Sequence, residues 1–517
     1  MNAPSTLIKN PFKTGLKACI TLLPLTFLLF QVSCQAPPAA SPELVIFPSP
    51  GDLSAVEGLQ ESKLFDVSVN GRDTFVYHGF EKEYNKYGFA RKGGHFVSFG
   101  FANQKPEIVV STQSPILSYT IKPALKGTAS KTGDEELSLI LEEKQKFLVT
   151  IQFEEGEDQW LIISAEAPPP TTAWNGSPET LVLGPGVHDY GRSWDPFTNG
   201  VKSLVIEGGA VVTATLRVVD KEGISISGNG LFAQAFRPHG RLEDPLQTEW
   251  MSTCMGAYFR DCKDVNLEGY AVINSPSYQL ELANCEDVVI RNLKLLGFGE
   301  NNNDGAHLYS RRVLMEDCFI AGNDDRICIT GLYDSEDREI KEMADQQKRI
   351  TGCAVGDITI RDIVFWGHRN GGDIMLTWNG AETCENIRIE NVTSLLSNKG
   401  GSYKGFLAAM HGGSVVVRDV EIRNATLDHG TFLSILVNEA SMWGAGGGAI
   451  RDVLLENITI AATPETLEDR VGGTSKESNV ANFTFRNVTL ANGEKMTSLE
   501  GTGIEVGDFV ENFIFEQ

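Results

Sequence analysis

The chain has 517 residues, of which 22% are charged, and it contains 52 glycines and 27 phenylalanines. This length exceeds one ordinary hydrophobic core and the composition excludes a disordered chain, so we expect a turn-rich β protein with two domains or one long solenoid. The 44 Lys and Arg against 68 Asp and Glu give a formal net charge of −24, which disfavours nucleic acid and anionic membranes as partners.

The first 34 residues predict an export signal. A basic start precedes an apolar stretch at 18–30 that is too short for a comfortable membrane span; the basic residues are Lys9, Lys13 and Lys17. Cys34 then follows a small residue and precedes a Pro- and Ala-rich tether at 35–43, which resembles a bacterial lipoprotein signal. We therefore expect export and lipidation of Cys34 at the outer membrane or cell surface, with the lipid as the only tie to a membrane. Because Gln31 departs from the usual aliphatic residue of that motif, a periplasmic or secreted protein is the alternative.

Residues 44–170 contain short strand-like runs separated by turns, such as 96–101 and 147–151. Runs of that length and spacing predict a β-sandwich. The Pro- and Thr-rich run at 168–172 marks the boundary with a second domain at 171–517.

A short block recurs through the second domain: a polar residue, apolar residues at alternating positions, then Asn or Asp. Its copies begin at Asp264, Asp287, Arg312, Asp357, Asn386, Asp419, Asp452, Asn482 and Asn512. Alternation within each block indicates a strand, and repetition at this spacing indicates stacked coils. A leucine-rich repeat is the structural rival, but the blocks lack its Leu-x-x-Leu-x-Leu frame. The pattern predicts a right-handed parallel β-helix.

Three cysteines stand two residues before the start of a block, namely Cys262, Cys285 and Cys384. They would therefore share one column of the solenoid. Neighbouring strands lie about 4.8 Å apart, which falls within the Cα range of a disulfide. A Cys262–Cys285 bridge and an interior ladder of small thiols are both open readings.

Two acidic motifs lie about one coil apart, Asn-Asn-Asp-Gly at 302–305 and Gly-Asn-Asp-Asp at 322–325. Stacking would bring Asp304 beside Asp324 and Asp325, and neighbouring carboxylates push their pKa values apart, which supplies an acid and a base. If the pair lay in a regular strand, alternation would turn Asp325 inward, and burying an unpaired carboxylate is costly. We therefore predict a turn at the pair, which leaves both carboxylates reachable from solvent. Turn-capping aspartates and a calcium site are the alternatives.

These motifs, followed by Gly-His at 367–368, resemble the signature of polygalacturonases, glycoside hydrolase family 28. The upstream sandwich and the run at 365–378 look more like the sister family 49, the dextranases and isopullulanases. The resemblance covers the architecture from about residue 181 onwards, whereas its specific motifs fill only 302–378.

The resemblance implies a secreted glycoside hydrolase that inverts the anomeric centre of a polysaccharide. Asp324 would be the general acid, and Asp304 and Asp325 would hold and activate the attacking water. It implies no metal and no organic cofactor, and we expect a monomer whose partner is its polysaccharide. Trp366 is expected to be a packing residue. The candidate substrate contacts are Asn302, His307, Arg326, His368, Arg369 and Trp378.

One departure from family 28 bears on the substrate. No Arg-x-Lys occurs in the blocks after His368, although polygalacturonases use that motif to grip a uronate. A neutral or unusual glycan is therefore favoured. Residues 333–349 are the candidate for a loop that blocks the cleft or grips the substrate. The alternatives are a polygalacturonase-like pectin hydrolase, a Ca²⁺-dependent polysaccharide lyase on the same fold, and a glycan-binding β-helix without catalysis.

Overall fold

The structure is a computed structural model. It describes residues 43–80, 93–169, 177–191, 193–233, 256–275, 278–298, 303–329, 353–367, 370–376, 381–396, 403–411, 415–437, 440–441, 444–445, 448–462, 470–500 and 502–517. The chain forms two compact units, Met1–Ala39 and Ala40–Gln517, and all described residues belong to the second. Cys34 and the predicted signal peptide therefore lie outside the described residues. Within the described ranges, no helix has the length and apolar character needed to cross a membrane.

The N-terminal part is a β-sandwich, as predicted. One sheet contains β1 (Leu44–Ile46), β2 (Leu59–Glu61), β5 (Tyr77–Gly79), β6 (Gly94–Phe101), β8 (Ile116–Lys122), β11 (Gln145–Phe153) and β12 (Gln159–Glu166). The other contains β3 (Phe65–Val69), β4 (Arg72–Thr74), β7 (Glu107–Thr112), β9 (Gly127–Gly133) and β10 (Glu136–Leu141). Alternate side chains of both sheets fill the space between them, for example Val110, Leu139, Val149 and Ile163.

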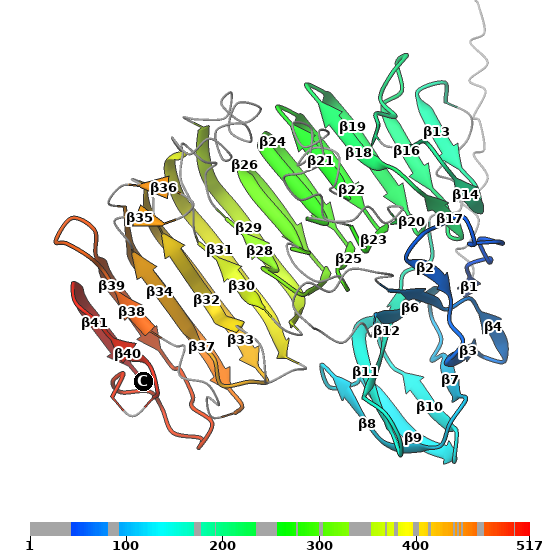
Figure 1. Cartoon of the computed structure of the whole chain (residues 1–517), viewed down its shortest axis with the longest axis horizontal. Coiled ribbons are helices and arrows are strands. Elements are labelled where there is room, and N and C mark those ends of the chain that lie inside the picture. Colours follow the sequence, from blue (N-terminus) through cyan, green and yellow to red (C-terminus); the bar gives the residue numbers. More distant parts are fainter. Residues whose placement is uncertain are drawn as a thin grey trace, which may run out of the picture. The chain divides into compact units, whose positions relative to one another are not determined.

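The following strands form one parallel sheet of 27 strands that coils into the predicted right-handed parallel β-helix. Figure 1 shows the coils stacked in chain order from β13 to β41. The first coils contain β13 (Thr180–Leu183), β14 (Gly186–His188), β15 (Ser193–Trp194), β16 (Ser203–Ile206), β17 (Ala210–Val212), β18 (Thr215–Val219), β19 (Glu222–Gly228) and β20 (Leu231–Ala233).

The central coils carry the motifs of interest. Their strands are β21 (Ala257–Arg260), β22 (Lys263–Glu268), β23 (Ala271–Ile273), β24 (Leu280–Arg291), β25 (Lys294–Leu296), β26 (Ala306–Glu316), β27 (Phe319–Gly322), β28 (Ile327–Cys328), β29 (Cys353–Gly367), β30 (Gly371–Met375), β31 (Ala381–Leu396) and β32 (Tyr403–His411). The last strands are β33 (Val416–Leu427), β34 (Leu433–Val437), β37 (Ala449–Ile460), β38 (Arg470–Gly472), β39 (Val480–Arg486), β40 (Glu505–Val506) and β41 (Val510–Glu516), with a separate hairpin of β35 (Ala440–Ser441) and β36 (Gly444–Ala445).

The recurring blocks bend the chain at both ends. The first residue of each block has a positive φ, as at Asp287 (57°) and Asn482 (58°), and so does the closing Asn or Asp, as at Asn457 (57°). Asn and Asp tolerate this left-handed conformation better than other non-glycine residues. Their side chains also bond along the stack: Asn457 Nδ2 donates to Asn424 Oδ1 at 3.0 Å, and Asn487 Nδ2 donates to Asn457 Oδ1 at 2.6 Å. The alternating residues between the bends point into the core.

The cysteine column belongs to that core. Cys262, Cys285 and Cys384 are buried free thiols within the apolar cluster of the β-helix. The structure thus adopts the thiol ladder rather than the Cys262–Cys285 bridge.

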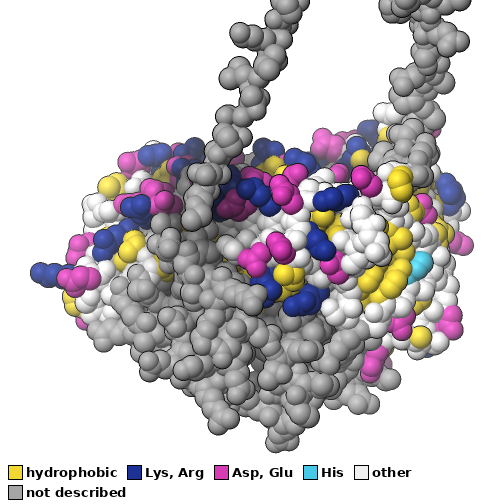
Figure 2. Space-filling view, turned by 90° about the horizontal axis from the view of Figure 1, so that it is seen from above, with side chains coloured by type: hydrophobic (Ala, Val, Ile, Leu, Met, Phe, Trp, Pro, Cys, Tyr) yellow, Lys and Arg dark blue, Asp and Glu magenta, His cyan; other side chains and the backbone are white. Residues whose placement is uncertain are grey.

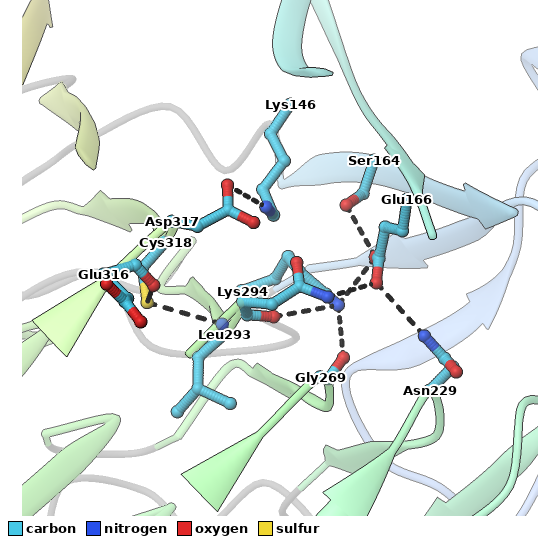
Figure 3. Close-up of polar contacts among 11 residues, drawn as sticks. Lys146, Ser164, Glu166, Asn229, Gly269, Leu293, Lys294, Glu316, Asp317 and Cys318 are labelled. Atoms are coloured by element: carbon cyan, nitrogen blue, oxygen red, sulfur yellow. Dashed lines mark hydrogen bonds and ion pairs between the residues drawn. The ribbon is translucent and has the colours of Figure 1, made fainter. Parts of the chain in front are cut away.

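Buried charges join the sandwich to the β-helix (Figure 3). Lys294 Nζ lies 2.7 Å from Glu166 Oε1, and the two side chains are 2% and 1% exposed. Asn229 and Asn292 donate to the other oxygen of Glu166, at 3.1 and 2.7 Å. Beside this cluster, Leu148 and Ile162 of the sandwich pack with apolar side chains of the coils, among them Leu296, Phe319 and Trp366.

The outer surface of the coils mixes charges of both signs. In Figure 2, acidic and basic side chains of the described residues are interspersed on the face that is drawn. Successive coils pair them, as in Arg361 with Glu316 and Arg423 with Glu456 at 3.2 Å. Such mixing offers no continuous basic stripe on this part of the described surface.

Candidate active site

The two acidic motifs meet on adjacent coils. The register pairs Ala306 with Ile327, and the amide of Gly305 donates to the carbonyl of Asp325 at 2.9 Å. Asp304 and Asp325 thus occupy neighbouring positions in the stack, about 4.8 Å apart along the axis. Paired residues are 21 positions apart in the sequence, as Ala306 and Ile327 are, so the two motifs are separated by one coil, and β26, β27 and β28 follow each other without an insertion.

The Asp-Asp pair lies in a bend between β27 and β28, where a turn was predicted. The prediction that both carboxylates are reachable from solvent is wrong for one of them. Asp324 is half-buried, but Asp325 is 5% exposed, and Asp304 is 4% exposed. The burial of Asp325 is tolerable because its Oδ1 accepts a hydrogen bond from the amide of Gly372 on the next coil, at 2.8 Å.

His307 lies on β26, three residues after Asp304, and is buried like it. Its Nε2 lies 2.8 Å from Asp304 Oδ2, its Nδ1 bonds the hydroxyl of Tyr309, and its ring stacks on Tyr278 with centroids 3.6 Å apart. Burial lowers the pKa of His307 to about 3, against opposing shifts from the nearby carboxylates. The neutral tautomer that satisfies both bonds carries its proton on Nε2 and donates it to Asp304, which favours the ionised carboxylate.

The same region offers ligand atoms for a metal. Oxygen, nitrogen and sulfur atoms of Asp304, His307 and Cys328 lie within 4.8 Å of one another. These ligand types suit zinc. However, both ring nitrogens of His307 already bond protein groups, Asp304 Oδ2 and the hydroxyl of Tyr309, so a bound ion would have to displace one of them. The geometry therefore fits a hydrogen-bonded carboxylate better than a metal centre.

A fourth carboxyl, which the sequence motifs did not single out, stands on the preceding coil. Glu281 on β24 is registered between Tyr258 on β21 and His307 on β26, and it is 1% exposed. Burial raises the pKa of Glu281 to about 8, with a further contribution from the charge of Asp304. Glu281 therefore keeps its proton at neutral pH and adds no charge beside the aspartates.

Arg326 supports the bend that carries Asp324 and Asp325. It is fully buried, its Nε donates to Asp373 Oδ1 at 2.9 Å, and one terminal nitrogen donates to the carbonyl of Asp324 at 2.7 Å. Gly371, on the next coil, allows that coil to approach the bend closely: it has φ +72°, and a Cβ there would lie 2.4 Å from the carbonyl carbon of Asp324. The guanidinium of Arg326 thus holds the protein backbone, whereas it was predicted to hold substrate.

Several predicted contacts lie outside the described residues: Asn302, His368, Arg369 and Trp378, together with the candidate loop at 333–349. Trp366 is fully buried and meets Trp160 of the sandwich edge-on, with centroids 4.9 Å apart, which fits the packing role expected for it.

Comparison with known proteins supports the expected relationship. No protein-family model matches the chain. The solved structure of Dex49A from Penicillium minioluteum, a family 49 dextranase, aligns with a TM-score of 0.61 and 12% identity over 91% of this chain and 96% of its own. A family 28 exopolygalacturonase of Yersinia enterocolitica aligns with a TM-score of 0.46 and 14% identity, over 79% of this chain and 96% of its own.

In sequence, the chain is 24% identical over 174 residues to rhamnogalacturonase B of Aspergillus niger. The match covers 31% of this chain and 30% of the relative, so the chain spans less than a third of that enzyme's length. The fold of the chain is that of Dex49A, and the sequence adds a local likeness to rhamnogalacturonase B.

Proposed function

We propose that the protein is a glycoside hydrolase that cleaves a polysaccharide with inversion, using Asp304, Asp324 and Asp325. The observation that carries this proposal is the meeting of the two motifs: Asp304 and Asp325 are neighbours on adjacent coils, and the half-buried Asp324 precedes Asp325. The fold shared with Dex49A supports the same reaction class.

The roles follow from exposure and partners. Asp324 is the more exposed carboxyl of the pair and suits the general acid, which must reach the glycosidic oxygen of a bound chain. Asp304 lies in hydrogen-bond contact with the buried, neutral His307, and it acts with Asp325 as the base that holds the attacking water.

The reaction is one displacement. The water oxygen bonds to the anomeric carbon while the bond from that carbon to the leaving oxygen breaks. Asp324 gives its proton to the leaving oxygen, and the base takes a proton from the water. Both carboxyls then return to their starting states by exchange with solvent, so no cofactor is consumed.

We propose a neutral glucan, of the dextran or pullulan kind, as the substrate. Arg326, a predicted substrate contact that could have paired with a uronate, is buried and paired with Asp373 instead. The likeness to the fold of Dex49A covers most of the chain. A galacturonan backbone is the second candidate, favoured by the local sequence match with rhamnogalacturonase B.

The deciding experiment is a screen of reducing-sugar release from dextran, pullulan, polygalacturonate, rhamnogalacturonan and algal galactans. Proton NMR of the first product on the active substrate should show the anomer opposite to that of the cleaved bond. Retention of configuration would contradict the mechanism. Unsaturated products, or loss of activity with a chelator, would instead establish the lyase alternative.

We also propose that the protein is exported and carries a lipid on Cys34, on the strength of the N-terminal pattern alone. Cells fed radiolabelled palmitate should label the wild type but not Cys34→Ala. Equal labelling of both proteins would show that Cys34 carries no lipid.

A further inference from the structure

A buried chain of polar groups runs from Arg326 to the coils beyond the Asp-Asp bend. Asp373 on β30 binds Arg326 through one oxygen at 2.9 Å and the hydroxyl of Ser394 on β31 through the other. Ser394 Oγ in turn lies 2.7 Å from Nε2 of His429. Asp373 and Ser394 are fully buried and His429 nearly so, which makes every one of these bonds costly to lose.

The direction of each bond follows from the donors available. An ionised Asp373 can only accept, so the single proton of the Ser394 hydroxyl points to the carboxylate. His429 must then donate Nε2–H to the serine oxygen. Burial lowers the pKa of His429, in keeping with a neutral ring.

The other end of the chain fixes the catalytic bend. One terminal nitrogen of Arg326 donates to the carbonyls of Asp324 and Asn370, at 2.7 and 2.8 Å. Gly367 leaves room for the guanidinium, since a Cβ there would lie 3.1 Å from its carbon atom. The placement of the Asp324 peptide therefore depends on Arg326, and that of Arg326 depends on Asp373.

We propose that Asp373, Ser394 and His429 form a positioning network that acts through Arg326 to hold Asp324 in place for catalysis. The inference rests on the proposed function, in which Asp324 is the general acid. None of the three network residues touches the reacting atoms; each serves by keeping the next one oriented.

The far end of the network is anchored as well. Asp428, adjacent to His429, accepts a hydrogen bond from the amide of Leu396 at 2.9 Å and pairs with Lys122 of sandwich strand β8 at 2.5 Å. The sandwich thus holds the turn that carries His429.

The test uses four variants of the full chain. Ser394→Ala removes the hydroxyl, and Asp373→Asn removes the counter-charge of Arg326. His429→Leu removes the donor, whereas His429→Gln keeps an N–H near the position of Nε2. Ser434→Ala is the matched control, because Ser434 is also a buried strand serine on a neighbouring coil but stands outside the network.

On the active polysaccharide, kcat should fall about 10²-fold in Ser394→Ala, Asp373→Asn and His429→Leu with KM nearly unchanged, because the acid is misplaced while binding persists. His429→Gln should recover most of the loss. In Asp373→Asn the uncompensated Arg326 cation should also move the alkaline limb of kcat to lower pH by roughly one unit. Activity equal to that of Ser434→Ala in all variants would overturn the network.

A second measurement needs no activity. Hydrogen exchange of peptides that contain Asp324 should speed up in Ser394→Ala and Asp373→Asn, but not in Ser434→Ala. If the wild type cleaves no polysaccharide yet exchange changes in this way, the proposed function fails and the network stands as a structural device. Unchanged exchange in both variants would refute the network itself.

Discussion

In the described part of the chain, charged groups are buried both at the junction of the sandwich and the β-helix and in the candidate active site, and the two places differ in their balance of charge. At the junction, Glu166 is paired with Lys294, and close by the buried Lys146 is paired with the exposed Asp317 at 2.7 Å. Each carboxylate there has its own cation.

Among the described residues of the candidate active site, the carboxyl groups outnumber the cations. Asp304, Asp324, Asp325 and Asp373 stand there with one described guanidinium, that of Arg326, because burial keeps His307 neutral. A buried ion pair with balanced charge can be explained by the packing of the sandwich on the β-helix alone. An excess of carboxylates costs stability and needs another reason for its presence, which catalysis supplies.

The largest effect should come from removing one charge of the unbalanced site. Asp325→Asn keeps the acceptor for the Gly372 amide but loses the base, so we expect kcat to fall by about 10²- to 10⁴-fold. Its free energy of unfolding should equal or exceed that of the wild type, because repulsion with Asp304 is relieved. Kinetics and urea denaturation of the same preparation check both parts. A large loss of stability without loss of activity would contradict the comparison.

The balanced site should behave in the opposite way. Lys294→Met leaves Glu166 buried without its cation and should lower the free energy of unfolding by about 3–5 kcal/mol. The folded fraction should keep the wild-type kcat. Combining it with Glu166→Gln should restore part of the stability, since the neutral amide leaves no unpaired charge and its oxygen can still accept from Asn229 and Asn292. If the double variant is as unstable as Lys294→Met, charge balance is not what holds the junction.

The protonated Glu281 predicts a pH dependence of stability. Its pKa is about 8 in the folded state against 4.5 as the ordinary value, so between these limits the folded protein binds a proton that the unfolded chain has lost. Stability therefore falls as pH rises, by about 1.4 kcal/mol per unit, or roughly 2–3 kcal/mol from pH 5 to pH 7. In Glu281→Gln this component should be missing. If the wild type and Glu281→Gln lose equal stability over this pH range, the Glu281 carboxyl is in contact with solvent.

The smallest effect concerns the bends. Asn457→Ala should cost about 1–2 kcal/mol, because alanine strains the positive φ and lacks the bonds to Asn424 and Asn487. Asn457→Gly loses the same bonds without the strain and should cost less. Thermal denaturation of the two variants gives the difference, and a larger loss for glycine would show that strain is not the reason for Asn.

The sequence allowed the fold to be predicted because its signal is local and repeated. Each block, such as the one from Asp452 to Asn457, encodes its own strand by alternation and its own bends by residue type. The neighbourhood of Asp304 and Asp325 was predictable for the same reason, since an uninterrupted coil brings residues 21 positions apart side by side.

The burial of Asp325 and the network behind Arg326 could not be predicted in this way. Their partners come from later coils: Gly372 and Asp373 follow the long insertion, and His429 lies two coils further on. Coil lengths vary there, so sequence spacing no longer reports which side chains meet. Strand parity alone implies a buried Asp325, but we set that reading aside because the hydrogen bond that makes the burial tolerable comes from the next coil.

The most direct measurement is the initial rate of reducing-sugar release by the wild type and by Asp324→Asn on the polysaccharide that the screen identifies. Asparagine has the shape of the acid but no proton to give, so the account predicts a fall in kcat of at least about 10²-fold with unchanged stability. Equal rates from the two proteins would show that Asp324 is not the acid and that the cluster of aspartates does not carry the reaction.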